Sequence, residues 1–266
     1  MQVIDTVAGF RKALDTERAA GRTIGLVPTM GALHAGHASL ISAADKTCDV
    51  VAATVFVNPL QFGPNEDLAT YPRPFDADVA LATEHGCDYI LHPSVDEMYG
   101  TSPVLTSIHV ADITEGMEGA IRPGHFDGVA TVVAKLFNAA GPCKAYFGEK
   151  DYQQLQVVTQ MVHDLSFPIE IVPCPIVREA DGLAMSSRNV YLSPEDRRAA
   201  TVLYRALQTA AGDPDNAVEI ITTIVNDCER ASLDYAAVVV TDHETRLLVA
   251  AKFGTTRLLD NLGVAR

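Results

Sequence analysis

The sequence predicts an α/β protein in which an open parallel sheet carries helices on both faces and a smaller α+β domain follows. Short apolar runs alternate with segments of helical periodicity through the first part of the chain. Residues 50–57 (VVAATVFV) are apolar at both alternating positions, which is typical of a strand covered on both sides. After about residue 176 the order changes to helices and then strands. We therefore expect a Rossmann-like domain at residues 1–176 and a small α+β lid domain at residues 177–266.

Each element of the first domain is predicted from its local pattern. Val7, Phe10 and Leu14 recur at helical spacing, and Gly21 follows them as a stop signal. By the same criteria, helices are predicted at residues 5–20, 36–48, 75–85, 129–140 and 152–165. Strands are predicted at residues 23–28, 50–57, 88–92, 104–110, 144–147 and 169–173. Prolines at four positions between residues 58 and 74 predict a long loop there.

In the second domain, Gly212 and Pro214 separate two predicted helices at residues 195–210 and 217–230. Short strands are predicted at residues 235–241, 247–253 and 256–259.

Composition limits the classes of function. The chain has 266 residues, of which 48% are hydrophobic, and this fits a soluble globular protein. Its formal net charge of −14 opposes nucleic acid and anionic lipid as partners, although a locally basic cleft could still bind ATP. The five cysteines form no CxxC pair, and neither a signal peptide nor a membrane-spanning run is visible. We therefore expect a cytoplasmic protein.

Residues 28–37 (PTMGALHAGH) join a predicted strand to a predicted helix through a glycine-containing turn. Free backbone N–H groups and the helix dipole favour an anion at such a place, and Gly31 and Gly36 allow close approach of a ligand. His34 and His37 are three residues apart, so both imidazoles could donate to phosphate oxygens. An ordinary turn with solvated histidines accounts for these ten residues equally well, and no nearby pattern completes a metal site.

Three further segments carry polar groups near predicted strand or helix ends. Asn58 and Gln61 follow a strand and could bind a small polar acid, or they could belong to a plain Asn-Pro turn. Lys150 could hold ATP phosphates, and Asp151 could cap a helix or bind ribose. Residues 185–188 (MSSR) suit a triphosphate, but from these residues alone a flexible surface loop is the favoured interpretation.

Five segments in this order resemble the pantothenate synthetase family of the HxGH nucleotidylyltransferase superfamily. They are residues 28–37, residues 56–63 (FVNPLQFG), residues 118–126 (EGAIRPGHF), residues 147–154 (FGEKDYQQ) and residues 185–189 (MSSRN). The ending at residues 257–261 (RLLDN) is also similar to the family. Five ordered motifs over essentially the whole chain are more specific than HxGH alone.

The resemblance implies a ligase that uses ATP to join pantoate to β-alanine through an acyl-adenylate, in a homodimer. Mg²⁺ is expected on the phosphates, because ATP chemistry of this type usually needs it. The ATP contacts it implies are Met30, Gly31, Ala32, Leu33, His34, Ala35, Gly36, His37, Gly148, Glu149, Lys150, Asp151, Val177, Met185, Ser186, Ser187 and Arg188. Pantoate is assigned to Asn58, Gln61 and Gln154, and β-alanine to Gln61. Arg122 and His125 are candidate anion contacts, although a plain turn is the commoner fate of such a segment.

The implied chemistry gives three residues catalytic roles. His37 is the candidate proton donor, His34 a donor to phosphate and Lys150 a phosphate clamp. No Mg²⁺ ligand from the protein is predicted. Two other functions share parts of the pattern: a nucleotidylyltransferase acting on another small substrate, and a nucleotide-sensing module without catalysis.

Overall fold

The computed structural model describes residues 1–64 and 66–265, which divide into two compact units. The first unit comprises Met1–Glu149 and Gln153–Pro175, and the second comprises Lys150–Tyr152 and the chain from Ile176 onward. The predicted boundary lay between residues 176 and 177. The sequence assigned Lys150–Tyr152 to the first domain, whereas the structure groups this segment with the second unit. Its contacts with two strands of the second unit, described below, account for this.

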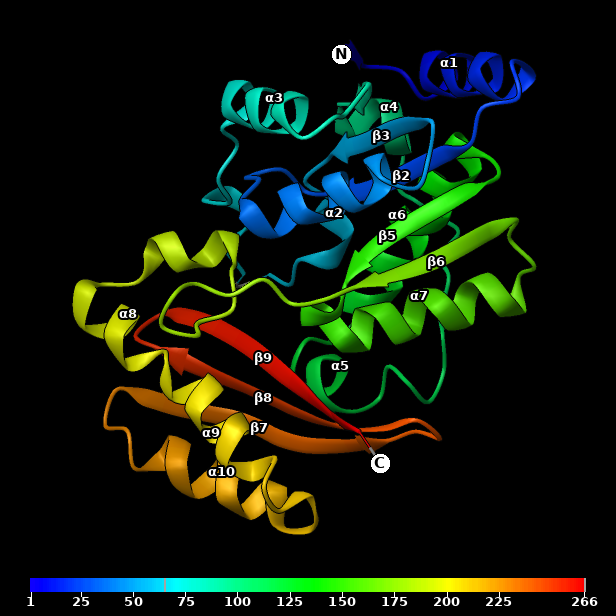
Figure 1. The fold of residues 1–266 in the computed structure, drawn as a ribbon. Helices are drawn as coiled ribbons and strands as arrows, with labels where there is room; N and C mark the ends of the chain where they lie inside the picture. The colour runs from blue at the N-terminus through cyan, green and yellow to red at the C-terminus, as the bar shows by residue number, and fades with distance from the viewer. Residues whose placement is uncertain (65, 266) are drawn as a thin grey trace. The chain divides into compact units, whose positions relative to one another are not determined.

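The first unit contains a six-stranded parallel sheet, which confirms the predicted fold class (Figure 1). Its strand order is β1-β4-β3-β2-β5-β6. The strands are β1 Gln2–Ile4, β2 Ile24–Thr29, β3 Val50–Val55, β4 Tyr89–Leu91, β5 Cys143–Gly148 and β6 Ile169–Cys174. The chain builds outward from β2 through β3 and β4, then returns to the other side of β2 with β5. This reversal makes the carboxyl ends of β2 and β5 the switch point at which open α/β sheets bind ligands.

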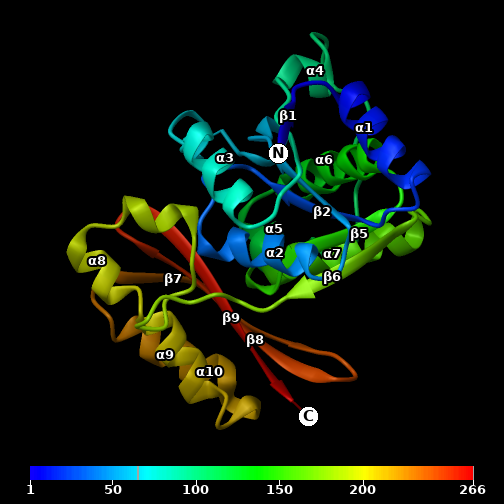
Figure 2. The same ribbon diagram turned by 45° about the horizontal axis from the view of Figure 1, so that its top comes forward.

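Helices cover both faces of this sheet (Figure 2). On one face, α1 (Val7–Ala19), α6 (His125–Ala140) and α7 (Tyr152–Asp164) share a core with Leu26 and Ala52. On the other face, α2 (Ala35–Asp45) and α3 (Phe75–Glu84) share a core with Val27 and Ala53. Successive strand residues point to opposite faces, so strands with apolar residues at every position fill both cores.

The first unit departs from the sequence prediction in several places. Residues 104–110 form no strand, and the N–H of Ile108 donates to the Thr131 hydroxyl (2.9 Å) instead of to a neighbouring strand. The predicted loop at 58–74 contains two short 3₁₀ helices, η1 (Pro59–Gln61) and η2 (Asp67–Ala69). Strand β1 and two short helices, α4 (Val95–Tyr99) and α5 (Met117–Ile121), were not predicted.

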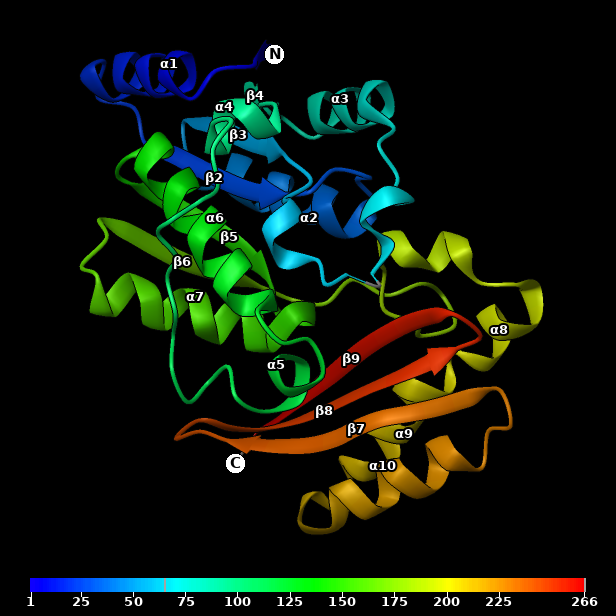
Figure 3. The ribbon, with the colours of Figure 1, turned by 180° about the vertical axis from the view of Figure 1, so that it is seen from behind.

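The second unit is built on an antiparallel sheet in the order β7-β8-β9 (Figure 3). The strands are β7 Ala231–Val240, β8 Glu244–Phe253 and β9 Thr256–Ala265, all longer than predicted. Helices α9 (Val202–Ala210) and α10 (Ala217–Asn226) pack apolar side chains such as Leu203 and Ile221 against this sheet, where they share a core with Leu247 of β8. The single helix predicted at 195–210 is two, because α8 (Pro194–Ala199) ends in a tighter turn in which the Leu203 N–H donates to Ala200.

Among the described residues, no helix has the length and apolar character needed to cross a bilayer.

Candidate active site

The turn between β2 and α2 brings the two histidines of the HxGH motif together. His34 is the N-cap of α2, in an extended conformation (φ −137°, ψ 178°), and His37 lies in the first turn of the helix. The Gly36 N–H donates to His34 Nδ1 (3.1 Å), and the His34 N–H donates to His37 Nδ1 (3.3 Å). The ring centroids are 4.2 Å apart. Two imidazoles therefore replace the usual serine and glutamate of a reciprocal helix cap.

This cap fixes the tautomer of both histidines. A ring nitrogen that accepts a backbone N–H cannot carry a proton, so in each neutral imidazole the proton sits on Nε2. Both rings thus offer an Nε2–H donor from one helix N-terminus. This is the form needed to donate to phosphate oxygens.

A buried carboxylate holds the preceding part of the turn. Asp78, on α3, is 1% exposed and accepts from the N–H of Ala32 (3.0 Å) and of Leu33 (2.7 Å). The Gly31 N–H donates to the Thr29 hydroxyl (3.1 Å). Burial raises the pKa of Asp78, and the two backbone N–H groups oppose that shift. The sequence prediction of free N–H groups is therefore wrong for residues 31–33, because these groups bind within the protein.

Gly31 is required at its place in the turn. Its φ is +84°, and an added Cβ would lie 2.9 Å from Val55 Cγ1 and 3.0 Å from Asp78 Oδ2. Glycine alone adopts this conformation without strain and leaves room for the Asp78 carboxylate.

A second loop, after β3, presents Gln61. Asn58 is fully buried and caps η1; its Nδ2 donates to Gln61 Oε1 (3.0 Å) and to the Gly128 carbonyl (3.1 Å). The Tyr99 hydroxyl donates to Asn58 Oδ1 (2.7 Å). Gln61 Nε2 donates to Met30 Sδ (3.1 Å), which is a weak acceptor. Gln61 can therefore offer its amide N–H to a stronger acceptor, whereas the Asn58 amide is occupied in holding Gln61.

Arg122 and His125 surround the backbone of the same loop. Arg122 forms a two-point ion pair with Glu66 (2.8 and 2.6 Å) and donates to His125 Nε2 (3.0 Å). His125 Nδ1 lies 2.8 Å from the Gln61 carbonyl oxygen. Burial, with Arg122 adding to it, lowers the pKa of His125 to about 4. The predicted anion contacts are thus engaged with Glu66 and with the loop that carries Gln61.

The two glutamines at the start of α7, Gln153 and Gln154, differ in their surroundings. Gln153 is 3% exposed, donates to the carbonyls of Ile113 (2.7 Å) and Gly116 (2.9 Å), and accepts from the Glu118 N–H (3.0 Å). It therefore supports the segment before α5. Gln154 is half-buried on the same helix, and its contact with pantoate stays a prediction.

Strand order brings three of the predicted loops to one edge of the sheet. Strands β3, β2 and β5 are neighbours and parallel, so residues 30–37, 56–63 and 148–149 all emerge at their carboxyl ends. The turn with the two histidines and the Gly148-Glu149 turn follow the two strands of the switch point. The chain passes into the second unit at Lys150.

The remaining predicted ATP contacts lie in the second unit. The Met185 N–H donates to the Val177 carbonyl (3.0 Å), so these two candidates close one hairpin. Ser186 caps η4 (Ser187–Tyr191) and accepts from the Arg188 N–H (3.2 Å). Lys150 Nζ lies 3.6 Å from Asp151 Oδ1. A short 3₁₀ turn, η3 (Glu149–Asp151), precedes α7 there.

Sequence reasoning missed the supports of the site. Asp78, Tyr99 and Glu66 lie far in sequence from the motifs they hold, and none stands in a pattern that predicts a partner. Only the acidic first turn of α3 hinted at Asp78, and that signal indicates a helix start rather than a contact.

Comparison with known proteins gives a consistent result. The family model described as pantoate-beta-alanine ligase matches residues 2–263. A pantothenate synthetase of Acinetobacter baumannii is 48% identical, with 100% of this chain and 99% of that protein covered. The crystal structure of pantothenate synthetase from Thermus thermophilus has a TM-score of 0.93 at 47% identity, with both chains fully covered. The pantoate-beta-alanine ligase of Francisella tularensis, complexed with beta-gamma ATP and beta-alanine, has a TM-score of 0.86 at 35% identity and covers 99% of this chain and 97% of that one.

Proposed function

The chain belongs to the pantoate–β-alanine ligase family, and from that premise we propose that it condenses pantoate with β-alanine at the expense of ATP. A pantoate carboxylate oxygen attacks the α-phosphorus, the bond to the β-phosphate breaks, and diphosphate leaves. The β-alanine amine then attacks the acyl carbon of the adenylate, and AMP leaves with release of a proton. Pantothenate, AMP and diphosphate are the products.

The reciprocal imidazole cap is the observation that carries the residue assignments. It supports a role for both Nε2–H groups as donors to the phosphates, since their Nδ1 atoms accept backbone N–H groups. His37 donates to the oxygen that bears developing charge as diphosphate leaves, and His34 donates to a neighbouring phosphate oxygen. Lys150 adds a compact positive charge on the phosphates, and residues 185–188 supply hydroxyl and guanidinium donors.

In this proposal, pantoate binds to Gln61 and Gln154. Gln61 Nε2 donates only to a thioether among the contacts described above, so a pantoate oxygen can replace that sulfur as the better acceptor. Gln61 also contacts β-alanine in this proposal. Asn58 becomes a support of Gln61, because both ends of its buried amide are already engaged.

The proposal also includes Mg²⁺ as a companion of ATP, a location in the cytoplasm and assembly of the chain into a homodimer. Mg²⁺ accompanies ATP and neutralises phosphate charge. Within the described part of the chain, no group of three or more His, Cys, Asp or Glu side chains could hold a metal ion. The ion is therefore expected to bind chiefly through phosphate oxygens.

The His37→Ala variant tests the mechanism. Pantoate-dependent exchange of diphosphate into ATP should fall by about 10² to 10⁴-fold, the usual contribution of a positioned acid or base. Formation of pantothenate from supplied pantoyl-adenylate and β-alanine should change little, because diphosphate does not leave in that step.

His163→Ala is the matched control, since His163 is exposed near the C-terminal end of α7, away from the turn that carries His37. Near-normal single-turnover release of diphosphate by His37→Ala would remove His37 from the mechanism. Accumulation of a stable nucleotidylated product in place of AMP would instead favour a nucleotidylyltransferase.

A further inference from the structure

Two adjacent polar residues near the end of the chain, Asp260 and Asn261, are buried in strand β9. Each is 2% exposed, and neither has a role in the mechanism above. Buried polar side chains are retained where they are fully hydrogen-bonded, so their partners indicate what they organise. Both sets of partners include segments that carry candidate ATP contacts.

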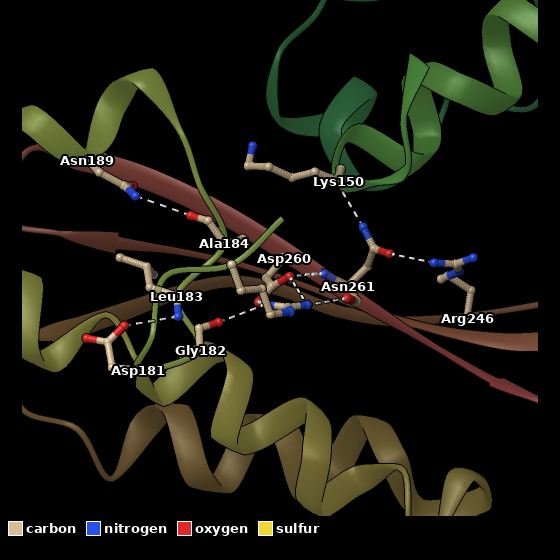
Figure 4. A network of polar contacts seen from close by, with 10 residues as sticks. Lys150, Asp181, Gly182, Leu183, Ala184, Asn189, Arg246, Asp260 and Asn261 are labelled. Atoms are coloured by element: carbon tan, nitrogen blue, oxygen red, sulfur yellow. Dashed lines mark hydrogen bonds and ion pairs between the residues drawn. The ribbon is translucent and has the colours of Figure 1, made fainter. Parts of the chain in front are cut away.

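Asn261 holds the main chain of Lys150 (Figure 4). Its Nδ2 donates to the Lys150 carbonyl oxygen at 2.8 Å, and its Oδ1 accepts from Arg246 Nη1 at 3.0 Å. The Asn261 N–H donates to Asp260 Oδ1 (2.8 Å). The amide is thereby oriented: the Arg246 guanidinium can only donate, so the Oδ1 of Asn261 must face it and the NH₂ must face Lys150.

Arg246 fixes the other end of the same segment. Its guanidinium carbon lies 4.5 Å from the ring centroid of Tyr152, and its side chain is paired with Glu244 (2.7 Å). Arg246 and Tyr152 are 6% and 8% exposed, so the stack is shielded from water. Residues 150 and 152 are therefore both attached to strands β8 and β9, which explains why this segment groups with the second unit.

Asp260 anchors a second segment from the same strand. Its carboxylate forms a two-point ion pair with Arg178 (2.6 and 2.9 Å), and Arg178 Nη1 also donates to the Gly182 carbonyl (3.0 Å). Arg178 follows Val177 directly and pairs with Ala184 in the hairpin closed by Met185. Figure 4 shows the contacts to Lys150 and to this hairpin arising from neighbouring positions on β9.

We propose that Asn261 is a positioning residue for the ATP chemistry, acting through the main chain of Lys150. A lysine side chain has four rotatable bonds, so holding its ammonium against a fixed phosphate costs less entropy when its backbone is itself fixed. The bond from Asn261 supplies that fixed point. This inference rests on the proposed function, in which Lys150 contacts the phosphates during adenylation.

Asn261→Ala and Asn261→Asp test the inference. The alanine variant removes both bonds, and the aspartate variant keeps an acceptor for Arg246 while losing the donor to Lys150. Both should lower pantoate-dependent ATP–diphosphate exchange by about 10- to 100-fold, the scale expected for misplacing a reacting group by an ångström. The KM for β-alanine and the conversion of supplied pantoyl-adenylate should stay unchanged. Exchange of wild-type magnitude in Asn261→Asp would overturn the proposal.

A double-mutant cycle distinguishes positioning from general destabilisation. If Asn261 acts through Lys150, adding Asn261→Ala to Lys150→Met should cause no further loss of exchange, whereas an additive loss would overturn the proposal. Asp234→Asn is the control, because it breaks an ion pair with Arg257 (2.6 Å) in the same sheet without touching Lys150. An equal loss of exchange in this control would also contradict a specific role for Asn261.

Two further readouts separate the possible failures. Hydrogen exchange of the backbone amides at residues 149–153 should accelerate in Asn261→Asp, and unchanged protection would contradict the proposal even if activity fell. If Lys150→Met itself retains normal exchange, then the proposed function of Lys150 fails. If Lys150→Met is inactive while both Asn261 variants are normal, only the positioning role fails.

Discussion

His125 is a buried histidine that works only as the neutral ring. Its Nε2 accepts from Arg122, whose guanidinium can only donate, so the ring proton resides on Nδ1 and is donated to the Gln61 carbonyl. A second proton, on Nε2, would place an N–H donor of the ring against the N–H donor of Arg122. Burial, aided by the Arg122 charge, accordingly lowers the pKa of His125 to about 4.

This lowered pKa predicts a pH-dependent stability. An unfolded histidine titrates near 6.5, so the unfolded state binds more protons than the folded state between about pH 6.5 and 4. The contribution of His125 is fully present above pH 6.5 and is lost as the pH falls toward 4, by at most about 3 kcal/mol.

Urea unfolding of wild type and of His125→Asn between pH 4 and 7 measures this effect. Asparagine can still donate to the Gln61 carbonyl but does not titrate, so the difference in unfolding free energy between the two proteins should shrink or reverse as the pH falls. A difference that stays constant over this range would show that His125 titrates with the same pKa in the folded and the unfolded protein, and would contradict the lowered pKa.

Residue types in a motif could be predicted from the sequence, but their partners could not. The sequence identified Asn58 and Arg122 as candidate ligands because amides and guanidinium groups suit anionic, hydroxylated substrates. In the structure the Asn58 amide holds Gln61, and Arg122 is paired with Glu66. The contact of Tyr99 with Asn58 joins residues 41 positions apart, and that of Arg122 with Glu66 joins residues 56 positions apart, so no local pattern predicts them.

At the scale of elements, the turn between β2 and α2 depends on one conformation of Gly31. The Gly31→Ala variant should lose about 1–3 kcal/mol of unfolding free energy, because alanine at φ +84° is strained and its Cβ would crowd Val55 and Asp78. Displacing the Asp78 carboxylate would also release the Ala32 and Leu33 N–H groups.

We therefore expect Gly31→Ala to impair adenylation more than the loss of stability alone explains. Chemical denaturation and ATP–diphosphate exchange measure the two effects. Gly100→Ala is the control, since Gly100 also has a positive φ but an added Cβ there meets nothing within 4 Å. Equal stability and activity of Gly31→Ala and wild type would refute the requirement for glycine.

Long elements with a clear period were predictable, and short ones held by other parts of the chain were not. The period of α1 and the doubly apolar β3 were both visible in the sequence. The three residues of β1 form a strand only by pairing with β4, and α4 has five residues with a capping serine, Ser94. Residues 104–110 have a strand-like composition, but Leu105 is 95% exposed and gains nothing from a sheet.

For the whole molecule, the sequence predicted the fold class but not the strand order. Placing β5 beside β2 creates the switch point, and this pairing joins residues more than a hundred positions apart. The assignment of Lys150 to the second unit was equally hidden, since its contacts come from Asn261 near the end of the chain. The role of the second unit as a lid stays a prediction.

The proposed Mg²⁺ should bind together with the nucleotide and not to the protein alone. A protein with a formal charge of −14 attracts cations diffusely, but tight binding of Mg²⁺ needs several oxygen ligands at one point. The described residues contain no cluster of three or more His, Cys, Asp or Glu side chains suited to a metal. Calorimetric titration of Mg²⁺ into nucleotide-free protein should therefore give no saturable binding, and dialysis against EDTA should leave the midpoint of thermal unfolding unchanged.

With a non-hydrolysable ATP analogue present, the same titration should saturate, because the phosphates supply the missing oxygen ligands. Lys150→Met should weaken the binding of the analogue itself, since a positive charge on the phosphates is lost. It should not create Mg²⁺ binding in the absence of nucleotide. Stoichiometric Mg²⁺ binding to the nucleotide-free wild type would contradict this account and would require a metal site formed by carboxylates of the protein.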